Sequence, residues 1–213
     1  MSNQDLFLEL RKDMVEYQLR RRDITEKNIL KVFAEIPRHE FVPQEYLDQA
    51  YDDHPVQIGE GQTISQPYMV ALMTQCLEPK PTDIVLELGT GSGYQAAILG
   101  RLVKKVYTLE RHAQLAENAK KVLDKLHIDN IEVVRADATK GYPKSAPFDK
   151  IIVTAYAKAV PRALFSQLKE GGIMVIPLGS ALGQLLFKIT KKGNEMRKKP
   201  ICECVFVPVI EGD

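Results

Sequence analysis

The sequence predicts an α/β protein: a Rossmann-like, doubly wound, mostly parallel seven-stranded sheet with an N-terminal helical extension. Two observations support this prediction. From residue 81 onward, short apolar segments with strand character alternate with helical segments, which is typical of a parallel sheet covered by helices. Before residue 80 the pattern is helical and irregular. We therefore expect an N-terminal unit over 1–80 that packs on a core over 81–213 as one compact whole.

Composition excludes several classes of protein. With 45% hydrophobic and 27% charged residues, the chain of 213 residues has an ordinary globular composition. A net charge of +1 provides no general attraction for nucleic acid. The sequence has no apolar segment of about 18 residues and no signal-peptide pattern, and three cysteines are too few for a disulfide framework. We expect a cytoplasmic protein without a membrane or nucleic-acid partner.

The first third of the chain predicts helices around one long loop. Apolar side chains recur at helical spacing over residues 4–21 and again over about 26–35. Pro37 should end the second helix. Residues 51–66 contain two glycines, a proline and many polar residues, which predicts a long loop of the kind that is usually functional. A proline suits the first turn of the next helix, over 67–77.

Seven segments of the core have strand character. They are 83–88, 105–110, 131–137, 148–155, 171–179, 184–192 and 201–209. Helices are expected after the glycine cluster to about residue 102, over about 112–126 and over about 161–168, so the first five strands should be parallel. The turn-rich stretch KKGNEMRKKP joins the last two strands and suggests an antiparallel end, whose strand order stays open.

The motif VLELGTGSGYQ follows the first predicted strand and contains Gly89, Gly91 and Gly93. Because Tyr94 stands where a dinucleotide fingerprint needs its third glycine, the spacing is GxGxG rather than GxGxxG. Glu87 would be an unfavourable neighbour for a pyrophosphate at a helix N-terminus. It would be a favourable neighbour for a cationic ligand. The motif therefore favours S-adenosyl-L-methionine, which carries an amino group and a sulfonium.

Acidic residues at two further strand ends support a nucleoside cofactor. Glu110 lies 23 residues after Glu87, and an acidic residue about 20 residues on binds ribose hydroxyls in nucleoside-binding folds. The alternative for Glu110 is a surface charge at a strand end. Asp137 ends the third predicted strand, where its side chain can meet the adenine amino group. Together with Arg111, these residues form the predicted cofactor site at the carboxyl ends of the strands.

The segment IGEGQTISQPYMVALM (58–73), with the glycine motif and IPRHEFVP (36–43), resembles the protein-L-isoaspartate O-methyltransferase family. Further matches lie at 146–155, 160–179 and 206–210. The resemblance covers nearly the whole chain, and QTISQPYM is its specific part because generic methyltransferases lack it. It implies methyl transfer from S-adenosyl-L-methionine to the free α-carboxylate of L-isoaspartyl residues in damaged proteins and peptides. The product cofactor would be S-adenosyl-L-homocysteine, and the ester would begin repair through a succinimide.

The family pattern places its active-site serine at Ser65 and its ribose-binding acid at Glu110. The resemblance also implies a substrate loop that contains Ile58, Gly59, Gln62, Thr63 and Ile64. Two positions depart from the pattern. The usual Gly-Asp-Gly after the third strand is Ala-Asp-Ala over 136–138 here, and Tyr156 and Lys158 follow the fourth strand. These two insertions would reshape the peptide-binding rim.

The expected chemistry needs neither a general base nor a metal. A carboxylate is already ionised at pH 7, and the Ser65 hydroxyl can orient it without neutralising it. The loop over 51–66 would act as a lid. An alternative for Ser65 is the N-cap of the helix that follows. Two other functions stay open: another S-adenosylmethionine-dependent O- or N-methyltransferase, and a non-catalytic module that binds damaged peptides on the same fold. We expect a monomer.

Overall fold

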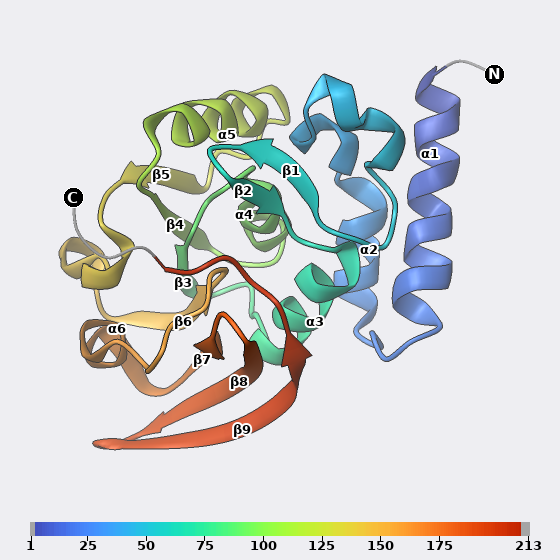
Figure 1. Cartoon of the computed structure of the whole chain (residues 1–213). Helices are drawn as coiled ribbons and strands as arrows, with labels where there is room; N and C mark the ends of the chain where they lie inside the picture. Colours follow the sequence, from blue (N-terminus) through green and yellow to red (C-terminus); the bar gives the residue numbers. More distant parts are fainter. Residues whose placement is uncertain (1–2, 210–213) are drawn as a thin grey trace.

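The computed structural model describes residues 3–209 and contains a seven-stranded sheet in the order β5-β4-β3-β6-β7-β8-β9 (Figure 1). The strands are β3 (Ile84–Leu88), β4 (Lys105–Glu110), β5 (Ile131–Arg135), β6 (Phe148–Val153), β7 (Leu168–Ser180), β8 (Gly183–Lys192) and β9 (Glu195–Cys204). The first five are parallel, and β8 and β9 are antiparallel to their neighbours. The predicted fold class is thus confirmed. The last residue of the match at 206–210 lies outside the described residues.

Alternating side chains of the parallel strands face two separate apolar layers. Val85 and Ile152 point into one buried cluster, whereas Leu86 and Ile151 point into the other. The first cluster is covered by the N-terminal helices together with α3 (Pro67–Leu77), α4 (Tyr94–Gly100) and α5 (Ala113–Lys125). The second is covered by α6 (Arg162–Gln167). Burial on both faces explains why these strands are nearly continuous apolar runs.

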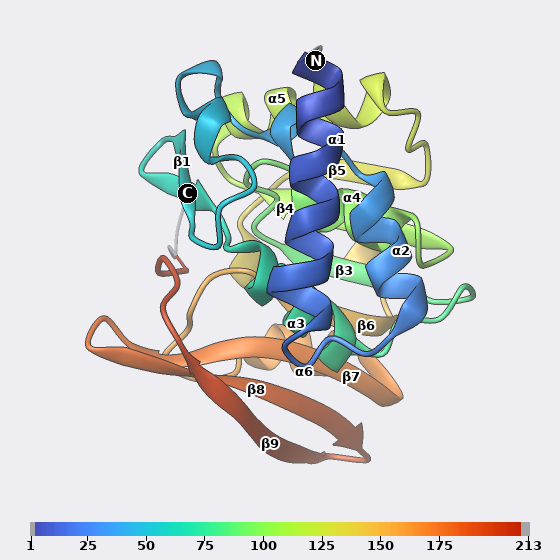
Figure 2. The same ribbon diagram turned by 90° about the vertical axis from the view of Figure 1, so that its right-hand side faces the viewer.

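The N-terminal extension differs from one simple pair of helices. The helix predicted over 4–21 is α1 (Asn3–Asp13) followed by a π-helix over Met14–Arg20. After α2 (Lys27–Glu35), two 3₁₀ helices cover Arg38–Phe41 and Gln44–Gln49. Figures 1 and 2 show α1, α2 and α3 grouped on one side of the sheet.

Three sequence expectations need correction. The segment over 51–66 contains a β-hairpin, β1 (Val56–Gly59) and β2 (Gln62–Ile64), whose turn has three consecutive positive φ angles at 59–61. The last strand is 195–204 rather than 201–209, because most of the turn-rich stretch pairs with β8 and only a short turn around Gly193 remains. The third strand ends at Arg135, so Asp137 lies beyond it.

The chain after β9 leaves the sheet edge and returns across the carboxyl ends of the strands (Figures 1 and 2). Its path is set by backbone hydrogen bonds to Tyr156, which follows β6. The Tyr156 N–H donates to the Val207 carbonyl at 2.9 Å, and the Val209 N–H donates to the Tyr156 carbonyl at 2.8 Å. These bonds explain why residues 205–209 do not extend β9.

The proposed boundary between 1–80 and 81–213 crosses a continuous buried cluster. Phe33 of α2 is fully buried and packs edge-on against Tyr94 of α4, with ring centroids 5.9 Å apart.

We predict that Phe33→Ala lowers the free energy of unfolding by about 3–5 kcal/mol and that the protein still unfolds in a single transition. Urea unfolding followed by circular dichroism measures both. Leu6→Ala is the control because Leu6 is 45% exposed. Two separated transitions would show instead that the extension folds independently.

Candidate active site

The candidate site lies at the carboxyl ends of β3, β4 and β6, where chain connections leave the sheet in opposite directions. Two open cavities meet there. We call the first the Ser65 cavity. It is lined by β2 and Ser65, the glycine loop and the start of α4, the end of β4, and the segments after β6 and β9. The lining includes Gln62, Thr63, Ile64, Ser65, Gly89, Gly91, Tyr94, Glu110, Thr154 and Val207. Its location is where ligands bind in doubly wound sheets.

We call the second cavity, which Arg111 helps to line, the Arg111 cavity. Apolar atoms dominate its wall, including those of Leu109, Ala138 and Val209. The two cavities share Gln62, Gly89, Glu110 and Ala155. They are therefore neighbouring parts of one site, joined at the glycine loop and the end of β4.

Gly89 is the position at which the glycine loop requires a glycine. Its φ is +91°, and a Cβ atom there would overlap the Thr154 hydroxyl. That hydroxyl donates hydrogen bonds to the carbonyls of Gly89 at 2.7 Å and of Leu88 at 2.9 Å. The loop is thus held against the segment after β6, and its backbone borders both cavities.

The Glu110 carboxylate organises the loop from the end of β4. Its Oε2 accepts a hydrogen bond from the Gly91 N–H at 2.9 Å. Its Oε1 accepts from the N–H groups of Arg111 at 2.9 Å and of His112 at 3.0 Å. Glu110 is 5% exposed, which excludes the alternative of an ordinary surface charge. The carboxylate borders both cavities, and its predicted contact with ribose stays a prediction.

Glu87 and Asp137 lie outside the described residues that line the two cavities. Both carboxyl oxygens of Glu87 are buried without a hydrogen-bond partner in the described structure. Burial raises the pKa of Glu87 to about 8; the Thr108 hydroxyl opposes this shift and the Glu110 charge adds to it. Its predicted role beside a cationic group of the cofactor stays a prediction.

Asp137 acts as the N-cap of a short 3₁₀ helix over Ala138–Lys140. Its Oδ1 accepts hydrogen bonds from the Thr139 N–H at 2.9 Å and the Thr139 hydroxyl at 2.7 Å. The Thr139 hydroxyl is the main cause of the lowered pKa of Asp137. This capping role explains why an aspartate stands between the two alanines. The contact of Asp137 with adenine stays a prediction.

The QTIS stretch lines the Ser65 cavity together with the glycine loop. Gln62, Thr63 and Ile64 belong to β2, and Ser65 follows directly. The N-cap of α3 is Gln66, which makes no capping hydrogen bond through its side chain. The alternative that Ser65 caps this helix is therefore wrong.

The other two predicted loop residues lie in β1. The Ile58 side chain packs on the glycine loop, 3.5 Å from the Cβ position of Gly91. Gly59, with φ +93°, begins the hairpin turn and has open space around it. The structure thus brings β1, β2 and the glycine loop together, and the role of this loop toward the substrate stays a prediction.

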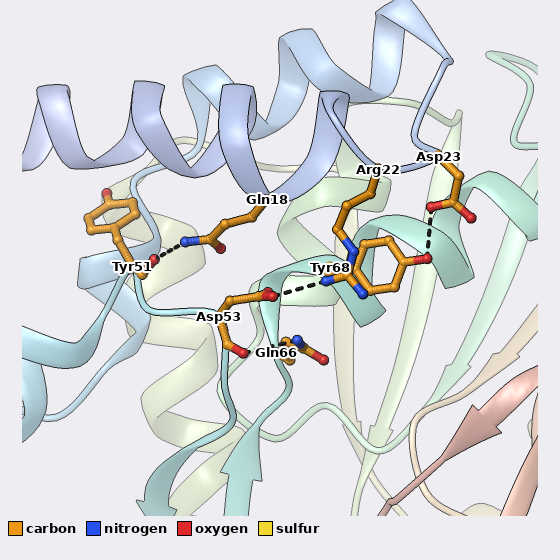
Figure 3. Close-up of polar contacts among 7 residues, drawn as sticks. All are labelled: Gln18, Arg22, Asp23, Tyr51, Asp53, Gln66 and Tyr68. Carbon is orange, nitrogen blue, oxygen red and sulfur yellow. Dashed lines mark hydrogen bonds and ion pairs between the residues drawn. The ribbon is translucent and has the colours of Figure 1, made fainter.

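The N-terminal extension holds both ends of this segment (Figure 3). The Arg22 guanidinium pairs with Asp53 at 2.9 Å and stacks on the ring of Tyr68, 3.4 Å from its centroid. The Tyr68 hydroxyl donates to Asp23 at 2.7 Å, and the Gln66 amide donates to the Asp53 carbonyl at 2.9 Å. These contacts anchor the segment on both sides of the β1–β2 hairpin, and its role as a lid stays a prediction.

Sequence reasoning missed Arg38, Tyr94, Thr154 and Val207. Arg38 is fully buried and donates to the Ser65 carbonyl at 2.8 Å. The sequence feature that could have identified Arg38 is its position as a cationic residue between two prolines, in the segment IPRHEFVP that matches the family. Val207 reaches the Ser65 cavity because its carbonyl is bound by Tyr156, one of the two residues that depart from the family pattern.

Two further features concern residues 3–209 as a whole. No helix in this range is long and apolar enough to cross a membrane. Within the same range, no group of three or more His, Cys, Asp or Glu side chains is placed to hold a metal ion.

Comparison with known proteins connects this geometry to a family. The family model for protein-L-isoaspartate(D-aspartate) O-methyltransferase (PCMT) matches residues 9–213. A protein-L-isoaspartate O-methyltransferase from Petrotoga mobilis is 52% identical over 199 residues, which are 92% of this chain and 93% of that protein. One from Trichlorobacter lovleyi is 50% identical over 201 residues, 94% of this chain and 93% of that protein.

Solved structures agree. A protein-L-isoaspartate O-methyltransferase with 30% identity has a TM-score of 0.83 over 96% of this chain and 66% of that one. A structure described as a beta-aspartate methyltransferase (PCMT) from Plasmodium falciparum, in complex with S-adenosyl-L-homocysteine, is 26% identical. Its TM-score is 0.82, over 95% of this chain and 99% of that one.

Fold and site together are those of an S-adenosylmethionine-dependent methyltransferase with a Rossmann-like sheet. Within this class, the chain belongs to the protein-L-isoaspartate O-methyltransferase family.

We predict that Gly89→Ala weakens S-adenosyl-L-homocysteine binding at least about tenfold, equivalent to about 1.4 kcal/mol. The new methyl group would overlap the Thr154 hydroxyl and displace the loop. Gly171→Ala is the matched control because Gly171 also has a positive φ, +71°, with open space around it and away from both cavities. It should lose only about 1 kcal/mol of stability from backbone strain. Titration calorimetry with unchanged affinity for Gly89→Ala would contradict the assigned close approach.

Proposed function

We propose that this protein transfers the methyl group of S-adenosyl-L-methionine to the free α-carboxylate of L-isoaspartyl residues in damaged proteins and peptides. The resulting ester begins repair through a succinimide. The observation that carries the proposal is that QTIS, the stretch specific to the resemblance, lines the same cavity as the glycine loop and Glu110. Substrate and cofactor segments thus share one cavity.

The shape of the site fits the proposed cofactor. The apolar wall of the Arg111 cavity suits a flat base, with Leu109 and Ala138 beside it. The Glu110 carboxylate, where the two cavities join, has acceptor capacity left for a ribose hydroxyl. The more polar Ser65 cavity would take the amino-acid arm. When bound, S-adenosyl-L-methionine supplies an electrophilic methyl group on a positively charged sulfur.

The residues of the chain have to orient the substrate rather than activate it. Its carboxylate is ionised at pH 7, so no side chain needs to remove a proton. The Ser65 hydroxyl donates one hydrogen bond to the carboxylate and fixes its direction. None of the described residues that line the Ser65 cavity is Lys or Arg. A direct ion pair there would stabilise the charged ground state more than the transition state, in which charge is lost.

Alignment and exclusion of water then account for most of the rate. The β1–β2 hairpin covers the glycine loop through Ile58 and carries the residues that face the substrate. Family membership favours this function over another methyltransferase reaction or a non-catalytic peptide-binding module. The cytoplasmic location and the monomeric state expected from the sequence remain predictions.

We predict that Ser65→Ala lowers methylation turnover about 10- to 100-fold, since one hydrogen bond to a charged group contributes about 1.5–3 kcal/mol. Affinity for S-adenosyl-L-homocysteine should stay nearly unchanged. The rate is measured with labelled methyl groups on an isoaspartyl peptide at saturating cofactor. Ser166→Ala is the matched control, because Ser166 lies in α6 and its hydroxyl donates to the Ala163 carbonyl. A normal turnover of Ser65→Ala would remove Ser65 from the mechanism.

The aspartyl peptide of the same sequence tests the substrate assignment. Its side-chain carboxylate lies one methylene further from the backbone, so it should miss the methyl group. Equal methylation of both peptides by the wild-type protein would contradict the isoaspartyl specificity while leaving the methyltransferase class intact.

We also predict that Glu110→Ala weakens cofactor binding by about 1.5–3 kcal/mol, because a charge-assisted hydrogen bond to ribose is lost. The same change frees the Gly91 N–H. The readout is the dissociation constant of S-adenosyl-L-homocysteine by calorimetry, with Glu117→Ala on the exposed face of α5 as the control. An unchanged constant would refute the ribose assignment.

A further inference from the structure

Arg38 has an unusual environment for an arginine. Its side chain is fully buried beneath the segment that carries Ser65. The Nε atom donates to the Ala50 carbonyl at 2.7 Å, and Nη2 donates to the Ser65 carbonyl at 2.8 Å. The guanidinium carbon lies 5.0 Å from the ring centroid of Tyr94, the first residue of α4 after the glycine loop. One side chain therefore contacts the substrate segment and the cofactor helix.

The positive charge of Arg38 has no ion-pair partner among residues 3–209. Both of its hydrogen bonds go to backbone carbonyls, and its Nη1 atom is buried without a partner. The negative charge of Asp53 raises the pKa of Arg38, but this carboxylate is itself paired with Arg22. Burial lowers the pKa of Arg38 to about 10, so the guanidinium is still charged at pH 7. A buried charge without a counter-ion is costly and calls for a function.

We propose that Arg38 is a positioning residue for methyl transfer: it fixes the Ser65 peptide unit beside the glycine loop and attracts the substrate carboxylate from behind that peptide. This inference rests on the proposed function. The charge lies one peptide unit from the cavity wall, and the arriving carboxylate supplies the missing negative charge.

The indirect position matters for the chemistry. Arg38 lies outside the described lining of the Ser65 cavity, so it forms no ion pair at the attacking oxygen. Its charge acts mainly on binding of the carboxylate, through the low-dielectric interior. Its two-point hold on the Ala50 and Ser65 carbonyls acts on turnover, because a misplaced Ser65 would misalign the carboxylate. The two effects can be separated by substitutions that keep or remove the charge.

The test is a double-mutant cycle between the residue and the substrate charge. Wild-type protein, Arg38→Lys and Arg38→Met are each titrated with an isoaspartyl peptide and with the isoasparaginyl peptide, in which the carboxylate is a neutral amide. S-adenosyl-L-homocysteine is present throughout, so no reaction occurs. We expect wild type to prefer the carboxylate peptide about tenfold or more. Arg38→Met should lose most of that preference, whereas Arg38→Lys should keep it.

Turnover provides the second readout. Both variants should lower kcat about 10- to 100-fold per cofactor-binding site, since neither retains the two-point hold on the backbone. The dissociation constant of S-adenosyl-L-homocysteine should change less than about threefold. Asn130→Ala is the matched control: its amide also holds backbone carbonyls, those of Gly100 at 2.9 Å, Val103 at 3.0 Å and Lys104 at 3.3 Å, at the opposite end of the strands. It should keep the wild-type kcat and peptide preference.

Equal loss of affinity for both peptides in Arg38→Met would overturn the inference, because a merely structural role affects them alike. If Arg38→Met does not fold, Arg38→Lys decides: a wild-type kcat overturns the inference and a lowered kcat supports it. If the wild-type protein methylates the isoaspartyl peptide but binds both peptides with equal affinity, the inference about Arg38 is wrong and the proposed function still stands. A wild-type protein that methylates no isoaspartyl peptide would overturn the proposed function and the inference with it.

Discussion

The three backbone hydrogen bonds accepted by the Glu110 carboxylate determine the shape of the site. They connect the end of β4 to the glycine loop after β3 through the Gly91 N–H, and they orient the chain toward α5 through Arg111 and His112. A single buried carboxylate thus sets where the two cavities meet. Because parallel strands end at the same edge of the sheet, this arrangement needs no long-range contact beyond the neighbouring strands.

The N-terminal extension completes the site from the other side. It contacts the 51–68 segment in two layers. In the outer layer Arg22 contacts Asp53 and Tyr68, and in the inner layer Arg38 contacts the Ser65 carbonyl. The outer layer is partly exposed, and surface ion pairs contribute little free energy. The inner layer is buried and directly contacts the peptide unit of Ser65. The extension is therefore a structural part of the site on the Ser65 side, packed on the core through Phe33 and Tyr94.

The parts that the sequence predicts correctly are those with local signals. Apolar runs identify the strands, and the glycine motif followed by an acidic strand end identifies the cavity at their carboxyl ends. The β1–β2 hairpin was missed because its Gly-Glu-Gly turn looks like loop sequence, and β9 was misplaced because pairing with β8 outweighs the low strand propensity of a charged stretch. Arg38 could not be assigned because its partners, Ala50 and Ser65, are distant in sequence. The same holds for Thr154, which reaches the loop only through the β3–β6 pairing.

The distribution of charge around the Ser65 cavity follows from the reaction. A carboxylate and a sulfonium neutralise each other during methyl transfer, so formal charges in direct contact with them would favour the reactants. Glu110 is the only acidic or basic side chain among the described residues of that lining. Glu87, whose pKa is raised by burial, lies outside that lining, and the charge of Arg38 lies behind the Ser65 peptide. If the substrate binds as proposed, Arg38 and Glu87 therefore lie one layer behind the cavity wall. The buried Glu110 carboxylate borders the cavity and is held by three backbone N–H groups.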